Sequence, residues 1–177
     1  MIREHFISDL SHWNSYLPLL WLALESTSGD IVEAGMGDGS TKKLHDYCFT
    51  SGRKLFSYES NEEWYRKFEH LNTNYHRVEY VGSNWEILFE HRFEKYNERT
   101  LGVLFSDEAP GFQRKYNISM LARTAAVIVV HDAEQSNDHG YKFSWIKPLF
   151  KYYKLHEFPG ASTAAFSNFI DVSKWQV

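Results

Sequence analysis

The sequence predicts a doubly wound α/β fold: a mostly parallel, seven-stranded sheet with an antiparallel last strand and helices on both faces, in three α/β/α layers. Strand-like and helix-like segments alternate through five units. The chain then ends in two strand-like segments joined by a Pro159-Gly160 turn, which is typical of a hairpin. With 177 residues, of which 43% are hydrophobic and 24% charged, the chain has the size and composition of one globular domain. We therefore expect a single domain over residues 1–177, with an N-terminal helical segment at residues 1–28.

The predicted strands are short apolar segments bounded by turn residues. Residues 125–130 are the most β-branched segment, which favours a central position in the sheet. Residues 101–105 are apolar at almost every position, which indicates burial on both faces. In chain order, the predicted strands are 31–34, 55–58, 78–81, 101–105, 125–130, 153–158 and 164–170.

The predicted helices lie between these strands and begin or end at capping residues. Asn61 is a favourable N-cap, and the two glutamates that follow it suit the positive end of a helix dipole. Gly52 is a typical residue to end the preceding helix. In chain order, the first predicted helices cover residues 11–24, with an interruption at Pro18, and residues 40 or 41 to 52. A third helix begins at Asn61, and two more cover residues 84–93 and 117–123. The last begins at about residue 144, and Pro148 limits its length.

Chemistry is expected where strands end, because an open parallel sheet binds ligands beyond the carboxyl ends of its strands. Gly35, Gly37 and Gly39 follow the first strand and let the backbone approach a ligand closely. The spacing departs from the dinucleotide fingerprint, because Ser40 stands where a third glycine is required. Glu59 lies 22 positions beyond Gly37, at the end of the second strand, where an acid accepts hydrogen bonds from ribose hydroxyls. The alternative is a tight turn without function and a solvated acid.

From about residue 11 to the C-terminus the chain resembles class I S-adenosylmethionine (SAM)-dependent methyltransferases, which are Rossmann-like. The segment Glu33-Ala34-Gly35-Met36-Gly37 is similar to the first motif of that family, and Glu59 matches its ribose-binding acid. The terminal hairpin matches its sixth and seventh strands. This resemblance implies SAM as the cofactor, with Glu33, Gly35, Gly37 and Glu59 in its binding site.

Two later segments resemble the branch of that family that methylates hydroxyls of sugars or other small molecules. They are residues 103–107 and 127–132, although Ala125-Ala126 stands where that branch often has two glycines. The resemblance implies methyl transfer to a hydroxyl or, as a second choice, to an amine. The alternatives are a cofactor-binding protein of the same fold that carries out other chemistry, and one without turnover.

Asn84 and Trp85 follow the third predicted strand and are candidates for adenine binding. The amide would read the edge of the ring, and the indole would stack on its face. The alternative is that Asn84 caps a helix and Trp85 belongs to the core.

Asp107 and Asp132 follow the fourth and fifth predicted strands, so we expect their carboxylates to approach one another. With Glu134 they offer the oxygen ligands that Mg²⁺ prefers. Metal-dependent O-methyltransferases are similar in carrying an acid after each of these strands, but Ala133 occupies the position of their third ligand. Two expectations are left open. Asp107 and Asp132 bind a divalent cation, or both accept hydrogen bonds from backbone amides in turns.

His131 is the preferred candidate for a general base, with Asp107 and Asp132 as further catalytic candidates. An imidazole of near-neutral pKa takes a proton from a hydroxyl as the methyl group arrives. The alternative is a histidine fixed by hydrogen bonds at a strand end. Most other histidines, including His76 and His91, are expected at the surface. Residues 134–142 are polar and contain Gly140, and we expect a mobile loop over the acceptor site.

Composition restricts the partners. A net charge of -4 without a basic tract argues against nucleic acid. The longest apolar run, residues 17–24, is too short to span a bilayer, so no membrane partner is expected. The single cysteine, Cys48, favours a reducing compartment, and we expect a cytoplasmic protein. The expected partner is a small-molecule acceptor, with a homo-oligomer as a source of a further pocket wall.

Overall fold

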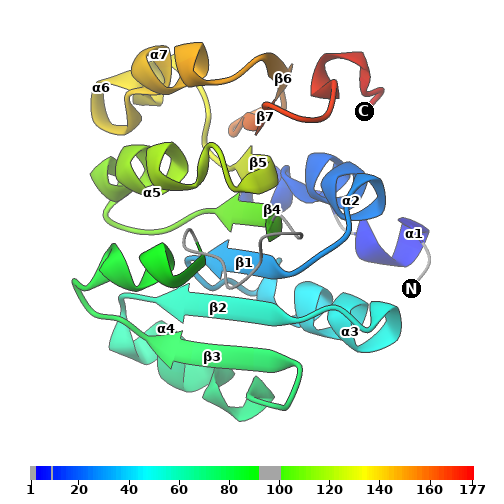
Figure 1. Cartoon of the computed structure of the whole chain (residues 1–177), viewed down its shortest axis with the longest axis vertical. Helices are drawn as coiled ribbons and strands as arrows, with labels where there is room; N and C mark the ends of the chain where they lie inside the picture. Colours follow the sequence, from blue (N-terminus) through cyan, green and yellow to red (C-terminus); the bar gives the residue numbers. More distant parts are fainter. Residues whose placement is uncertain (1–2, 9, 92–100) are drawn as a thin grey trace.

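The computed structural model describes residues 3–8, 10–91 and 101–177, and its centre is one seven-stranded sheet (Figure 1). The strand order is β3-β2-β1-β4-β5-β7-β6. All neighbours from β3 to β5 pair in parallel, whereas β7 runs antiparallel to both β5 and β6. The predicted fold class is therefore confirmed, including the antiparallel last strand. The strands are β1 (Ile31–Ala34), β2 (Leu55–Glu59), β3 (His76–Tyr80), β4 (Leu101–Ser106), β5 (Ala125–Val130), β6 (Tyr152–His156) and β7 (Thr163–Ser167).

Helices and short 3₁₀ turns connect the strands. In chain order they are α1 (Arg3–Phe6), η1 (His12–Asn14), α2 (Leu17–Ser26), α3 (Thr41–Ser51), α4 (Glu62–Phe68), η2 (Glu69–Leu71), η3 (Trp85–His91), η4 (Gly111–Gln113), α5 (Arg114–Leu121), η5 (Gln135–Asn137), α6 (Asp138–Tyr141), α7 (Phe143–Ile146), η6 (Lys147–Leu149) and η7 (Val172–Lys174). None of the helices in these ranges is both long and apolar enough to cross a membrane.

The two faces of the sheet bury two separate hydrophobic cores. On one face, Val103 and Phe105 of β4 pack with residues of α2 and α3. On the other face, Leu104 of the same strand packs with residues of η3, α5 and α7. This alternation explains why β4 and β5 are buried at every position, since each face is covered. Burial of one such side chain contributes about 1.5–3 kcal/mol.

Local sequence signals set several helix ends as predicted. The Asn61 side chain accepts hydrogen bonds from the backbone N–H groups of Glu63 and Trp64 at the start of α4. Gly52 ends α3 in the left-handed conformation, with a φ of 70°. Pro18, in contrast, does not interrupt a helix. It lies in the first turn of α2, where its missing N–H has no intrahelical partner to lose.

The helix predicted over residues 84–93 forms differently. Residues 85–91 are the 3₁₀ segment η3, and residues 92 and 93 lie outside the described ranges. The helix predicted to begin at Asn117 starts earlier, at Arg114. That shift brings Arg114 into the first turn of α5, at the carboxyl edge of the sheet.

Candidate functional site

The glycine-containing loop after β1 lies against the end of β4. Gly35 has a φ of 84°, and a Cβ added to it would lie 2.6 Å from backbone atoms of Asp107 and Glu108. A side chain is therefore excluded at Gly35 by both conformation and space. Gly37 is less restricted, because the nearest atom to an added Cβ is the Ser40 Oγ at 3.6 Å.

Glu33 is fully buried beneath this loop. Its Oε1 accepts hydrogen bonds from Ser40 Oγ at 2.6 Å and Thr41 Oγ1 at 3.1 Å, and its Oε2 accepts one from Ser57 Oγ at 2.6 Å. Thr41 Oγ1 in turn accepts the Gly37 N–H at 2.9 Å. Burial raises the pKa of Glu33 to about 7, although the three hydroxyls oppose the shift. Glu33 thus supports the loop from below, through hydroxyl groups.

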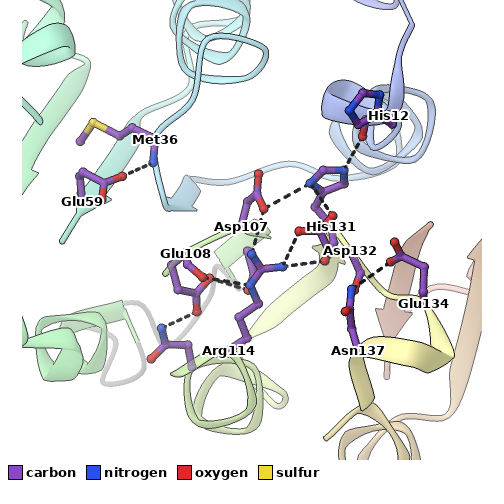
Figure 2. A network of polar contacts seen from close by, with 12 residues as sticks. His12, Met36, Glu59, Asp107, Glu108, Arg114, His131, Asp132, Glu134 and Asn137 are labelled. Atoms are coloured by element: carbon purple, nitrogen blue, oxygen red, sulfur yellow. Dashed lines mark hydrogen bonds and ion pairs between the residues drawn. The ribbon is translucent and has the colours of Figure 1, made fainter. Parts of the chain in front are cut away.

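Glu59 joins the loop to the start of α4, as Figure 2 shows in part. Its Oε2 accepts the Met36 N–H at 2.8 Å, and its Oε1 accepts the Asn61 N–H at 2.7 Å. Only 5% of the residue is exposed, so the alternative of a solvated acid is wrong. Ser60 Oγ also approaches Oε1 at 3.5 Å, so Oε2 has the greater remaining capacity to accept from a ribose hydroxyl.

Asn84 and Trp85 differ in their surroundings. Asn84 is exposed, whereas Trp85 is only 3% exposed and belongs to the core that η3 shares with α5. The Trp85 Nε1 has no hydrogen-bond partner among the described residues. Trp85 also lines a hollow of about 590 Å³ between η3 and α5. The buried indole N–H is thus an unsatisfied donor in the core, and another part of the same residue borders a hollow of ligand size.

Asp107, His131 and Asp132 meet at the carboxyl edge of the sheet, as predicted. They follow the neighbouring strands β4 and β5, whose residues Ser106 and Val130 are paired in register. One ligand atom from each of the three lies within 4.8 Å of the others. Asp132 has a φ of 55°, so the chain turns sharply there. The carboxylates are partly exposed, by 28% for Asp107 and 32% for Asp132.

His131 uses both ring nitrogens within the protein. Its Nδ1 lies 3.3 Å from Asp107 Oδ1, and its Nε2 lies 3.1 Å from the backbone oxygen of His12 (Figure 2). Burial disfavours the charged imidazolium, but the hydrogen bond to Asp107 and the charges of Asp107 and Asp132 outweigh it, so the pKa of His131 is raised. In this conformation both ring nitrogens are engaged by oxygen atoms of the protein. Its predicted role as a base requires a neutral ring whose Nε2 is released from the backbone oxygen of His12.

Arg114 is the central residue that the sequence analysis missed. It is 4% exposed, and its Nε donates to the Glu108 backbone oxygen at 3.0 Å. One terminal nitrogen donates to the His131 backbone oxygen at 2.7 Å, and the other to Asp107 Oδ1 at 3.0 Å. The terminal nitrogen that donates to His131 also lies 3.8 Å from Asp132 Oδ2. A signal was present, since an arginine in the first turn of a helix is disfavoured by the helix dipole unless acids compensate it.

The ligand atoms of Asp107, His131 and Asp132 lie close enough together to hold a metal ion, but Arg114 competes for the same carboxylates. The Arg114 guanidinium already lies between the two carboxylates, and Glu134 is directed toward Asn137, at 3.5 Å from its Nδ2. At about 4 Å and an effective dielectric constant of about 20, a guanidinium repels a divalent ion by about 8 kcal/mol, which offsets the attraction of one carboxylate at the same distance. Arg114 therefore weakens a metal site at these carboxylates.

Residues 134–142, expected to form a mobile loop, contain short helical turns. They comprise η5 and α6, and Asn137 Nδ2 donates to the Asp132 backbone oxygen at 3.0 Å. The Tyr141 ring lies over the Arg114 guanidinium, with 4.4 Å between the ring centroid and Cζ. These contacts place the segment beside the acidic edge. Its predicted mobility stays a prediction.

His76 and His91 were expected at the surface, but the structure contradicts that expectation. His76 is fully buried, with its Nε2 2.9 Å from Ser57 Oγ and its Nδ1 3.0 Å from His45 Nδ1. His91 lies 2.8 Å from the Tyr58 hydroxyl. Burial lowers the pKa of His76 to about 3 and that of His91 to about 4, so both rings are neutral at pH 7.

No protein-family model and no curated protein matches this sequence. Solved structures nevertheless resemble it over most of its length. The O-methyltransferase TomG of Streptomyces achromogenes, involved in tomaymycin synthesis and solved in complex with SAM, gives a TM-score of 0.65 at 16% identity, covering 93% of this chain and 85% of TomG. An O-methyltransferase from Bacillus cereus, solved with SAH, gives 0.62 at 15% identity, covering 91% and 83%.

The chain also resembles the structure of a methylase that is described as acting on rRNA. An rRNA methylase from Streptococcus thermophilus gives a TM-score of 0.52 at 10% identity, covering 86% of this chain and 97% of its own. The chain therefore has the fold of class I SAM-dependent methyltransferases. A fold does not determine the acceptor, so the acceptor has to be argued from the site.

Proposed function

We propose that this protein is an enzyme that transfers the methyl group of SAM to a hydroxyl of a small molecule or sugar, with an amine as the second choice. One observation carries the proposal. The Glu59 carboxylate is bonded to the backbone of the glycine loop, at the same sheet edge as Asp107 and His131. The methyltransferase fold thereby carries, at one sheet edge, a carboxylate that can bind a ribose and groups that can accept a proton.

The cofactor-binding residues are proposed from this geometry. Gly35 and Gly37 present the backbone, Glu33 holds the loop that contains them, and Glu59 accepts the ribose hydroxyls. The hollow lined by Trp85 and the neighbouring Ser83 is of a size that suits adenine, and Asn84 lies between these two residues in the sequence. The sulfonium of SAM makes its methyl group electrophilic, so the protein mainly aligns the acceptor and accepts one proton.

The proton is proposed to pass to Asp107. This carboxylate is partly exposed, whereas both nitrogens of His131 are occupied. His131 orients Asp107 in the described conformation and can act as a base itself only as a neutral ring whose Nε2 is released from His12. Asp132 is proposed to bond to the acceptor. A divalent cation is left out of this proposal because Arg114 lies between the carboxylates.

Methyl transfer from SAM labelled in its methyl group tests the proposal. The purified protein is incubated with separate panels of sugars and small hydroxyl compounds, small amines, and rRNA. Label is expected in a hydroxyl compound, and Asp107→Asn is expected to lower turnover at least tenfold. Asp46→Asn is the control, because Asp46 lies on α3 in an exposed ion pair with Lys42. Label only in rRNA contradicts the acceptor class, and SAM binding without any transfer favours a binding protein.

A further inference from the structure

The Arg114 side chain bridges the two strand ends that form the acidic edge (Figure 2). From α5 it donates to the backbone of Glu108, which follows β4, and to the backbone of His131, which follows β5. It also donates to the Asp107 carboxylate. Because both strand ends are held by one planar group, the separation of Asp107 and Asp132 is fixed by Arg114.

The guanidinium is itself held in place. It is almost fully buried, and the Tyr141 ring covers it at 4.4 Å. Gly111 makes room for that ring, since a Cβ there would overlap a carbon of the Tyr141 ring. An arginine stacked on an aromatic ring and bonded through three nitrogens has little freedom to turn away.

The negative charges at this edge are partly offset within the protein. Asp107 and Asp132 supply two negative charges, and Arg114 supplies one positive charge. The His131 ring lies 3.3 Å from Asp107 Oδ1 and 3.6 Å from Asp132 Oδ1. A divalent cation would therefore meet two carboxylates whose charge Arg114 already offsets in part.

We propose that Arg114 is the positioning residue of the acceptor site and serves as its fixed cation, so that the site works without a divalent metal. Arg114 orients the Asp107 carboxylate toward the acceptor hydroxyl and keeps Asp132 beside it. The role in acceptor positioning rests on the proposed function, whereas the preference for arginine over a metal does not. The two parts therefore have separate tests.

The first test measures Mn²⁺ binding by electron paramagnetic resonance, without any substrate. The wild-type protein is expected to bind no Mn²⁺ at millimolar concentration. Arg114→Gln removes the guanidinium and is expected to bind Mn²⁺, and adding Asp107→Asn to that variant is expected to abolish the binding. Lys115→Gln is the matched control, because it removes one positive charge from the same helix and is expected to behave as the wild type. Arg114→Lys retains a charge and is expected to bind no Mn²⁺.

Wild-type Mn²⁺ binding that Asp107→Asn abolishes would overturn the proposal, and this arm holds even if an Arg114 variant fails to fold. A folded Arg114→Gln protein that binds no Mn²⁺ would overturn it as well.

The second test follows turnover with the labelled cofactor. Chelator is expected to leave wild-type turnover unchanged, and Arg114→Gln is expected to lower it at least tenfold, with partial recovery in Arg114→Lys or on addition of Mn²⁺. Loss of wild-type turnover in chelator would overturn the inference. Complete absence of wild-type turnover, with the Mn²⁺ results as expected, would instead reject the proposed function.

Discussion

Replacing Glu59 separates its structural bonds from its proposed bonds to the cofactor. Both carboxylate oxygens accept backbone N–H groups, at 2.8 Å from Met36 and 2.7 Å from Asn61. Glu59→Ala leaves both donors without this partner at a site that is 5% exposed. An unsatisfied buried donor costs about 1–3 kcal/mol, so the free energy of unfolding is expected to fall by about 2–6 kcal/mol. Glu59→Gln retains one acceptor oxygen and is expected to lose about half as much.

Cofactor affinity is expected to fall in addition. Hydrogen bonds to a charged group contribute about 1.5–3 kcal/mol, which corresponds to a dissociation constant about 10- to 150-fold larger. Urea unfolding measures the stability, and calorimetry with SAH measures the affinity of the folded variants. Glu62→Gln is the control, because Glu62 is exposed in the first turn of the same helix, paired with Arg66. Unchanged SAH affinity in folded Glu59→Gln would refute the ribose assignment.

Three further predictions concern the same edge of the sheet. The raised pKa of His131 means that its stabilising contribution is complete below the unfolded pKa of about 6.5 and is lost as the pH rises through the higher folded value. Urea unfolding from pH 5.5 to 9 should show this loss in the wild type and not in His131→Gln; an equal pH dependence in both would contradict it. Gly35→Ala should lower the free energy of unfolding by about 2–4 kcal/mol, because the added Cβ meets backbone at a positive φ, whereas Gly37→Ala should remain near the wild type in stability and lose SAH affinity. Similar stability losses in the two glycine variants would argue against this account of the loop. Hydrogen exchange of residues 134–142 should be fast in the free protein and slower with cofactor and acceptor bound, and equal protection in both states would make the segment a fixed surface feature.

The strands and the cofactor loop were predictable because their signals are local. Residues 31–34 and 125–130 were bounded correctly, since each is an apolar run that ends at turn or polar residues. Glu59 was placed correctly by its position at the end of a strand. Its bonds to Met36 and Asn61 were not predictable, because they depend on the packing of three segments.

The contacts around His131 depend on tertiary structure that no local pattern encodes. The His131 ring meets the backbone oxygen of His12, which lies 119 positions away in the chain. A backbone acceptor leaves no trace in residue identity, so the occupied Nε2 was invisible in the sequence. Arg114 was missed for a related reason: the start of α5 was predicted three residues too late, at Asn117, which left the arginine in a loop.

A crystal structure of the protein with SAH would show whether the cofactor binds as proposed. Both ribose hydroxyls are expected within about 3.2 Å of the Glu59 carboxylate oxygens, the usual limit for a hydrogen bond. Adenine is expected in the hollow beside Trp85, with the sulfur turned toward Asp107. SAH bound away from Glu59, or bound there with its sulfur turned away from Asp107, would contradict the proposed methyl transfer at this edge.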